Sequence, residues 1–255
     1  QADATLYGSF RAALHSADGT DLDLRDESTR IGIKGDVDLG LQDTKGLFHW
    51  EANMETTDSD AYDAGNGMFA SRLAYLGATG SWGTALVGRQ YHPHYLLVNL
   101  VTSPFDSATG DAGEWNQLGN NVHKRQDNTV AYHSPVMNGF QVIGGAVIAA
   151  ASNDVDPNTD VDDDGLADSN MDGYNIAAKY AAGDLYVAAS YGDVQADAAG
   201  TTTDVETFGL AASYKFGDLG LAAKYETQDV DGASEKQAWE LAATYDIGAT
   251  QLQAR

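Results

Sequence analysis

Residues 48–55 read Phe-His-Trp-Glu-Ala-Asn-Met-Glu, so that apolar and polar side chains alternate at every position. Successive side chains of a β-strand point to opposite faces, whereas an amphipathic helix repeats its apolar residues every three or four positions. The stretch therefore predicts a β-strand with one apolar face and one polar face.

The same period of two recurs along the rest of the chain, with Gly and Ala frequent on the apolar faces. Several of these faces end in Tyr, Trp or Phe, which suits rings placed at the headgroup level of a bilayer. A soluble β-sandwich, such as a lectin, also alternates, but its apolar face must fill a core, and these faces offer few bulky pairs. The pattern favours a membrane barrel. The other alternating segments are 5–15, 28–37, 174–180, 207–216, 219–226 and 239–245.

The connections between these segments fall into two classes. Gly183-Asp184 and Gly217-Asp218 are predicted to be tight turns, whereas 153–172, 194–203 and 228–236 are long, acidic and rich in Gly. Outer-membrane barrels combine short turns on one side of the membrane with long loops on the other. The asymmetry supports the same fold.

The number of strands and the end of the sequence bear on closure of the barrel. The alternating segments amount to about twelve complete strands and the start of a thirteenth. Residues 246–255 alternate but stop before any terminal aromatic residue. Because an open edge would expose unpaired backbone groups to lipid, we expect the C-terminal strands to be missing from this sequence. We predict an all-β fold, a transmembrane antiparallel β-barrel, with 1–255 forming a single domain.

Charge and composition exclude several classes of protein. The chain holds 38 acidic and 14 basic residues, a formal charge of −24, which disfavours nucleic acid as a partner. It has no cysteine, which excludes a disulfide scaffold and thiol chemistry. No stretch approaches the roughly 20 apolar residues of a membrane-spanning helix. The chain begins Gln-Ala-Asp without a basic and apolar leader, and we interpret it as a mature form whose signal peptide has been removed.

Three stretches, taken in this order and at this spacing, resemble one protein family, that of the Gram-negative general diffusion porins. The resemblance covers nearly all of the chain. The stretches are Ser-Thr-Arg-Ile-Gly-Ile-Lys-Gly at 28–35 with Asp-Leu-Gly at 38–40 and Gly-Leu at 46–47; Ser-Arg-Leu-Ala-Tyr-Leu-Gly at 71–77 with Trp-Gly-Thr at 82–84 and Gly-Arg-Gln at 88–90; and Arg-Gln-Asp-Asn-Thr-Val-Ala-Tyr at 125–132 with Ser-Pro at 134–135 and Gly-Phe at 139–140.

This resemblance implies a sixteen-stranded barrel, so that four strands, or roughly 70 to 90 residues, would be missing here. It also implies a homotrimer in the outer membrane of a Gram-negative bacterium, multi-pass, in contact with membrane lipid and lipopolysaccharide, and exported through the inner membrane by a signal peptide. The third outer loop of the family folds into the lumen, and here that constriction loop would span 91–124. Ser103-Pro104-Phe105-Asp106 departs from the Pro-Glu-Phe-Gly-Gly run often seen in the family.

Five arginines are predicted to form a positive wall at the constriction, where a narrow pore sorts solutes by size and then by charge. Period two puts three of them on polar strand faces, and the resemblance adds two positions that face the lumen in the family. One of these two, Arg89, has the same parity along its strand as the apolar Val87, so alternation does not by itself support its inward direction. The alternative is that all five are ordinary solvated or salt-bridged residues. The first three are Arg11, Arg30 and Arg125, and the other two are Arg72 and Arg89.

Acidic side chains of the constriction loop would oppose this wall and create a transverse field in which polar solutes align their dipoles. The alternative is that these acids are merely solvated. Three further inward cations are predicted to tune the vestibule and no more, and overall we expect a mild preference for cations. The loop acids are Asp106, Asp111 and Glu114, and the inward cations are Lys179, Lys215 and Lys224.

The segment 160–168 has the spacing of a partial calcium loop. Asp160, Asp162, Asp164 and Asp168 stand at positions one, three, five and nine, with Gly at six. Carboxylate oxygens at this spacing suit Ca²⁺, but the twelfth position is Met171 where an EF-hand has a bidentate Glu. The alternative is a solvated acidic outer loop without metal.

No motif in the sequence requires an enzyme or a cofactor. There is no Gly-x-Ser-x-Gly elbow and no phosphate-binding Gly-Lys-Ser/Thr loop, and we interpret His92-Pro93-His94 as packing or hydrogen-bonding residues rather than metal ligands. The sequence therefore predicts a passive diffusion channel for small hydrophilic solutes and ions. The alternatives are a substrate-specific porin that binds a sugar or an anion, and a non-conducting barrel that acts as an adhesin or anchor.

Overall fold

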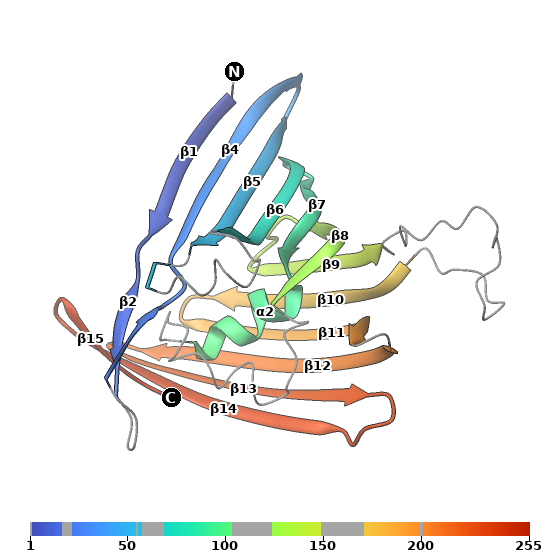
Figure 1. Ribbon diagram of the computed structural model, residues 1–255. Helices are drawn as coiled ribbons and strands as arrows, with labels where there is room; N and C mark the ends of the chain where they lie inside the picture. Colours follow the sequence, from blue (N-terminus) through green and yellow to red (C-terminus); the bar gives the residue numbers. More distant parts are fainter. Residues whose placement is uncertain are drawn as a thin grey trace.

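The computed structural model describes residues 2–16, 22–54, 56–57, 69–103, 124–148, 171–198 and 201–255. One curved antiparallel sheet of 13 strands dominates the molecule, and each of its strands is hydrogen-bonded to the next one along the chain (Figure 1). A separate two-stranded ribbon pairs β2 (Ala12–His15) with β3 (Asp23–Asp26).

The large sheet runs in the order β1-β4-β5-β6-β7-β8-β9-β10-β11-β12-β13-β14-β15, and its two edge strands, β1 and β15, are not paired with each other. The strands are β1 (Ala2–Ser9), β4 (Arg30–Leu41), β5 (Thr44–Met54), β6 (Phe69–Gly80), β7 (Gly83–Tyr91), β8 (Arg125–His133), β9 (Phe140–Ile148), β10 (Met171–Ala182), β11 (Leu185–Ala198), β12 (Thr201–Phe216), β13 (Leu219–Val230), β14 (Lys236–Ile247) and β15 (Thr250–Ala254).

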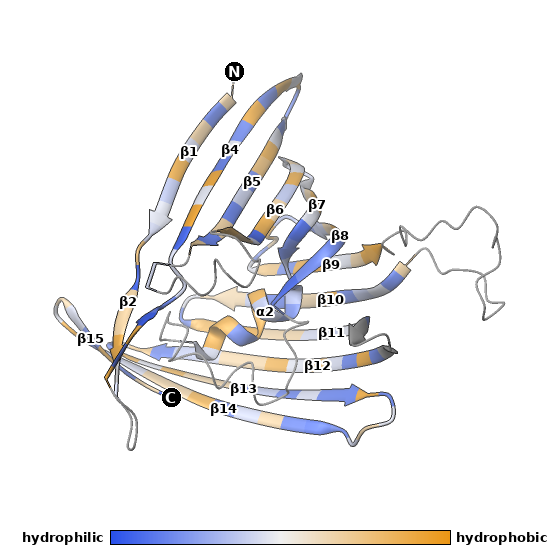
Figure 2. Cartoon of the chain, viewed as in Figure 1, coloured by the Kyte–Doolittle hydropathy of each residue, from blue (hydrophilic) through white to orange (hydrophobic). Residues whose placement is uncertain are grey.

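The register confirms that the alternation sorts side chains between two faces. Leu6 pairs with Ile33, which pairs with Trp50, and all three side chains are exposed on the convex face. One residue along, Tyr7 pairs with Gly32 on the concave face. Figure 2 shows the resulting alternation of hydrophobic and hydrophilic positions along the strands. An apolar convex face and a polar concave face are what a barrel wall in lipid requires.

The structure corrects three of the predicted boundaries. Segment 5–15 is broken between β1 and β2, the predicted loop at 194–203 is mostly strand, and the predicted loop at 228–236 shortens to 231–235 between β13 and β14. β11 and β12 stay in register out to the pair Ala198–Thr201, because each ladder partner satisfies the backbone of the other whatever the side chains are. Acidic and Gly-rich composition therefore did not end these strands.

The predicted tight turns are confirmed at both positions. Gly183 and Gly217 have φ of 58° and 61°, in the left-handed region, and a Cβ built on either would meet nothing within 4 Å. Glycine is needed at these turns for its backbone conformation and not for space.

A short helical segment lies across the concave side of the sheet (Figure 1). It consists of α2 (Pro93–Leu97) and the 3₁₀ helix η1 (Asn99–Thr102), which contact strands from β9 to β14. His92 begins it as the N-cap, and its side chain accepts a hydrogen bond from the His94 backbone N–H. Among the described residues, no helix has the length and hydrophobicity needed to cross a membrane.

The two faces of β10 predict opposite responses to a charge. Ile176 is exposed on the convex face, and Ile176→Arg should lower the free energy of unfolding in lipid vesicles by about 2–4 kcal/mol, because the guanidinium would enter hydrocarbon. Ala181 has the opposite parity, on the face of Lys179, so Ala181→Arg serves as the control. Equal losses in urea titrations of the two variants would contradict the assignment of faces.

Candidate pore lining

We call residues 92–103 the inserted segment, because the chain leaves the wall after β7 and crosses the concave side. Its apolar anchor is Leu97, which packs with Ile143, Ala177 and Ala188 of the wall. The hydroxyl of Tyr186 donates a hydrogen bond to the Leu97 carbonyl at 2.8 Å. Burial of these side chains holds the segment against the wall instead of leaving it free in the lumen.

The two histidines of the segment lie against two glycines of the wall, one of which makes room for its histidine. A Cβ on Gly209 would lie 2.4 Å from Cε1 of His94, and one on Gly192 would lie 3.4 Å from Cε1 of His92. Neither glycine has a positive φ; the requirement at Gly209 is space, whereas 3.4 Å at Gly192 is an ordinary contact distance. The close approach allows both imidazoles to be almost completely buried.

His94 bridges two strands of the wall. Its Nδ1 is 2.7 Å from Oγ of Ser190 on β11, and its Nε2 is 3.0 Å from Oε2 of Glu226 on β13. A carboxylate only accepts, so Nε2 carries the proton and donates, and Nδ1 then accepts from the Ser190 hydroxyl in the neutral ring. One imidazole thus ties α2 to two strands.

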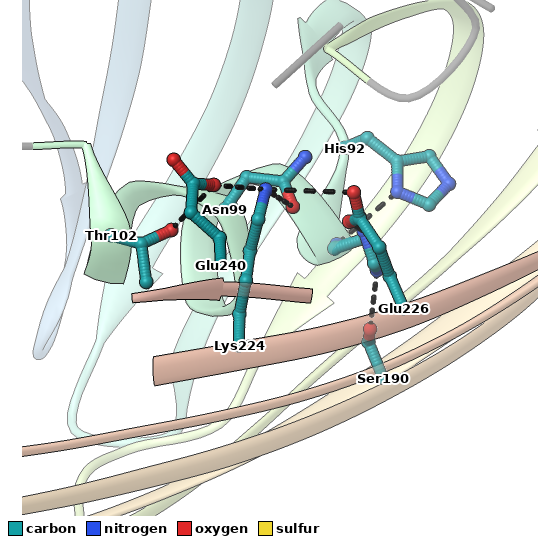
Figure 3. Close-up of polar contacts among 8 residues, drawn as sticks. His92, Asn99, Thr102, Ser190, Lys224, Glu226 and Glu240 are labelled. Carbon is teal, nitrogen blue, oxygen red and sulfur yellow. Dashed lines mark hydrogen bonds and ion pairs between the residues drawn. The ribbon is translucent and has the colours of Figure 1, made fainter. Parts of the chain in front are cut away.

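Lys224 stands at the centre of a buried charge network (Figure 3). Its Nζ lies 3.5 Å from Oε1 of Glu226, 3.2 Å from Oε2 of Glu240 and 3.4 Å from Oδ1 of Asn99. Its side chain has no exposed surface. Glu240 also accepts from the Thr102 hydroxyl at 3.1 Å, so both helical turns of the segment are held.

The formal charges of this network balance. Arg255 Nε is 2.6 Å from Oε1 of Glu240, which gives two cations, Arg255 and Lys224, against the carboxylates Glu226 and Glu240. Each buried ion carries a desolvation cost of several kcal/mol, which only its partners offset. Loss of one charged member would therefore leave the buried charges unbalanced. We call Ser190, Lys224, Glu226, Glu240 and Arg255 the wall network.

The order Ser190–His94–Glu226 has the connectivity of a hydrolase triad but not its accessibility. Ser190 is only 5% exposed and its hydroxyl is covered by α2. A nucleophile must reach a carbonyl carbon beside an oxyanion hole, and this buried hydroxyl cannot. The arrangement supports an anchoring role.

The opposite part of the wall, on β4 to β8, carries cations. Arg72 donates from Nε to Oε1 of Glu51 at 2.6 Å, and from Nη1 to Oδ1 of Asn53 at 2.9 Å. Arg30 acts electrostatically on the same Glu51, and Arg125 lies close enough to Arg72 for the two charges to repel. Arg30 and Arg72 therefore lie around one carboxylate, and Arg125 lies beside Arg72.

The other two predicted arginines lie differently. Arg11 donates from Nε to Oγ of Ser9 at 2.8 Å, in the break between β1 and β2. Arg89 forms a separate ion pair with Asp127 at 2.6 Å, across the irregularity in register between β7 and β8. In the described part of the chain, neither forms an ion pair with Glu51, so the two stand apart from the cluster of three.

Several predicted residues fall outside the described residues, and one prediction is corrected. The loop acids Asp106, Asp111 and Glu114 lie outside the described ranges, as do the calcium-loop residues Asp160, Asp162, Asp164 and Asp168. Lys224 was expected to tune a vestibule, but it is wholly buried under η1. Its inward direction was predicted from alternation, whereas its burial depends on where the inserted segment folds back.

The wall network was missed at the level of sequence. Glu226 and Glu240 lie on the predicted inner faces of their strands, so alternation placed them in the lumen without distinguishing them from other inner residues. His94 is 132 positions from Glu226, and no local spacing links them. The interpretation of His92-Pro93-His94 as packing and hydrogen-bonding residues agrees with the contacts.

Comparison with known proteins places this geometry among porins. The family described as Gram-negative porin matches residues 1–255. The chain is 28% identical over 144 residues to a chitoporin of Vibrio furnissii, covering 53% of this chain and 38% of that protein. The chain therefore spans well under half the length of this curated relative.

Solved porin structures share the fold. The anion-selective porin from Comamonas acidovorans superposes with a TM-score of 0.72 at 21% identity, over 99% of this chain and 78% of that one. A loop L8 deletion mutant of OmpT from Vibrio cholerae superposes with a TM-score of 0.70 at 17% identity, over 99% of this chain and 80% of that one. OmpF of Salmonella typhi in complex with daunomycin superposes with a TM-score of 0.68 at 18% identity, over 96% of this chain and 75% of that one. These similarities establish the outer-membrane β-barrel fold.

The wall network predicts a large loss of stability on neutralising its central cation. Lys224→Met should lower the free energy of unfolding by about 3–5 kcal/mol, because Glu226 and Glu240 would remain buried with too little positive charge. Lys215→Met is the matched control, since Lys215 pairs with Asp246 in the open and should change little. Urea titration of both variants measures the difference in the free energy of unfolding. Similar unfolding midpoints for the two variants would contradict a stabilising role for buried Lys224.

The close fit between Gly209 and the His94 ring predicts a steric effect of a larger side chain at position 209. Gly209→Ala should destabilise the protein by about 1–3 kcal/mol, because the new methyl group displaces His94 from the wall. Gly144→Ala is the control, since its Cβ would meet its nearest atom only at 3.8 Å. Thermal unfolding in detergent compares the two, and an unchanged melting temperature for Gly209→Ala would contradict the tight fit.

Proposed function

Because the chain belongs to the Gram-negative porin family and so to the outer membrane, we propose that it forms a passive diffusion channel for small hydrophilic solutes and ions. The observation that carries the proposal is the inserted segment, which crosses the concave face and is held there by hydrogen bonds to buried charged side chains of the wall. A segment fixed in this way narrows a pore to a set size without closing it. Members of this family are channels and not enzymes.

Selectivity would come from the facing wall. Arg30 and Arg72, on β4 and β6, act on Glu51, and Arg125 on β8 lies beside Arg72, so positive charge exceeds negative charge among these four residues. Fixed guanidinium groups in a narrow, low-dielectric opening raise the local concentration of anions. The acidic residues elsewhere in the chain would draw cations to the mouth of the pore.

We further propose the assembly and surroundings that the family suggests. The protein would be a homotrimer whose apolar convex faces contact membrane lipid. Lipopolysaccharide would surround its outer rim. Support comes from the exposed apolar side chains on the convex face, such as Leu76 and Val130. Calcium in the acidic segment 160–168 remains a proposal that rests on the spacing of its aspartates.

A second function has a specific observation in its favour. The relative from Vibrio furnissii is named a chitoporin, which supports a channel with a preference for a sugar. A substrate-specific porin would show current block that saturates with the concentration of one oligosaccharide, whereas a general diffusion porin would not.

Reconstitution in planar bilayers tests the proposed function. We expect ohmic channels that open in groups of three, and Arg30→Gln/Arg125→Gln, with or without the Arg11→Gln change predicted from the sequence, should shift the reversal potential in a KCl gradient toward cation preference. Arg25→Gln is the control, because Arg25 pairs with Asp23 on the exposed ribbon. Absence of conductance would reject the channel, and an unchanged reversal potential in the triple variant would reject the role of the arginines.

A further inference from the structure

A continuous chain of hydrogen bonds runs along the concave wall from β6 to β1. The Tyr75 hydroxyl is 2.9 Å from Nδ1 of His49, and Nε2 of His49 is 2.6 Å from the Tyr7 hydroxyl. Tyr7 then donates to Oε2 of Glu51 at 2.6 Å. The His49 ring meets both tyrosine rings edge-on, with centroids 5.8 Å and 5.2 Å away. These contacts hold the imidazole in one orientation.

Glu51 sets the direction of every proton in this chain. Its other oxygen accepts from Arg72, so the carboxylate is ionised and only accepts. The Tyr7 hydroxyl has one proton, which it gives to Glu51, so its oxygen accepts from Nε2–H of His49. In the neutral ring Nδ1 therefore has no proton, and it accepts from the Tyr75 hydroxyl.

Protonation of His49 reverses one end of the chain. The proton enters at Nδ1, which then donates to the Tyr75 oxygen, while Nε2–H keeps its bond to Tyr7. The Tyr75 hydroxyl proton must rotate away from the ring. The step takes one proton from solvent, adds one positive charge to the wall and breaks no covalent bond except that of the incoming proton to its donor.

The groups around His49 do not cancel this charge. Tyr7 faces it from β1, Lys34 and Arg30 lie on β4, Glu51 on β5, Tyr75 and Arg72 on β6, and Tyr91 on β7. Lys34 is exposed, with Nζ 5.2 Å from the centroid of Tyr7. Glu51 is the single carboxylate among these groups and is already bound to Arg72. His49 is half-buried, so solvent can supply its proton.

We infer that His49 is a selectivity-determining residue of the pore, whose protonation adds a positive charge to the Arg30–Arg72 wall and shifts the channel from cations toward anions. The inference rests on the proposed channel function and names a regulation of the same site. A unit charge about 5 Å from an ion in water changes the ion's local concentration by about fourfold before screening by salt.

Reversal potentials in a KCl gradient at pH 8.0 and pH 5.5 test the inference. The cation-to-anion permeability ratio of the unmodified protein should fall by about twofold or more at the lower pH, where ordinary carboxylates, with pKa near 4, stay ionised. His49→Gln should abolish this fall, because the amide can donate to Tyr7 and accept from Tyr75 but carries no charge. His49→Lys should show the low-pH ratio already at pH 8.0.

His133→Gln is the matched control. His133 is also half-buried on the concave face, paired with Thr84 and Ile143, but it lies toward the short turns and outside the hydrogen-bonded chain. This variant should keep the full pH response. A response that survives in His49→Gln, or is lost in His133→Gln instead, would overturn the inference while leaving the channel function intact. Absence of conductance in the unmodified protein would instead reject the channel function itself.

Discussion

Every backbone N–H and C=O of a wall that faces lipid must be hydrogen-bonded within the wall, because hydrocarbon offers no alternative partner. The 13-strand ladder meets this requirement for the strands between its two edges by pairing each of them with a strand on either side. The ladder holds strands together irrespective of side-chain chemistry, which explains why β11 and β12 continue through an acidic and Gly-rich stretch. Side chains on the concave face are then free to be polar or charged.

The polar side chains of the concave face differ in burial and in bonding partners between its two halves. On β11 to β14 the polar side chains are buried and bind one another and the inserted segment, through contacts of His94 and Lys224 with buried carboxylates. On β4 to β8 Glu51 and Arg72 are buried as an ion pair, whereas Arg30, His49 and Arg125 are only partly buried. One half thus holds the inserted segment, and in the proposed channel the other half would set the electric field that a solute meets.

Glu51 joins the structural and electrical roles on the second half. It neutralises Arg72 in a buried pair, and it orders the protons of Tyr7 and His49. A single carboxylate bound at both oxygens therefore defines which hydrogen-bonding groups the wall presents to the lumen.

The alternation of residues 48–55 and its repeats determined the fold class, the face of nearly every strand residue and the inward direction of Arg30 and Lys224, because period two is a local property of a strand. Alternation alone would have grouped Arg72 with Ala74 and Leu76 on the convex face. The irregularity in register between Glu51 and Ala52 leaves Arg72 as an extra residue and turns it inward to Glu51.

The tertiary structure alone decided which inner residues meet. The bond from His94 to Glu226 joins positions 132 residues apart, and it exists because Gly209 leaves room for the ring and Leu97 anchors the segment beside it. Burial of Lys224 follows from the same docking. Such contacts depend on strand register, on the path of the inserted segment and on the absence of one Cβ, none of which is encoded in the period of a single strand.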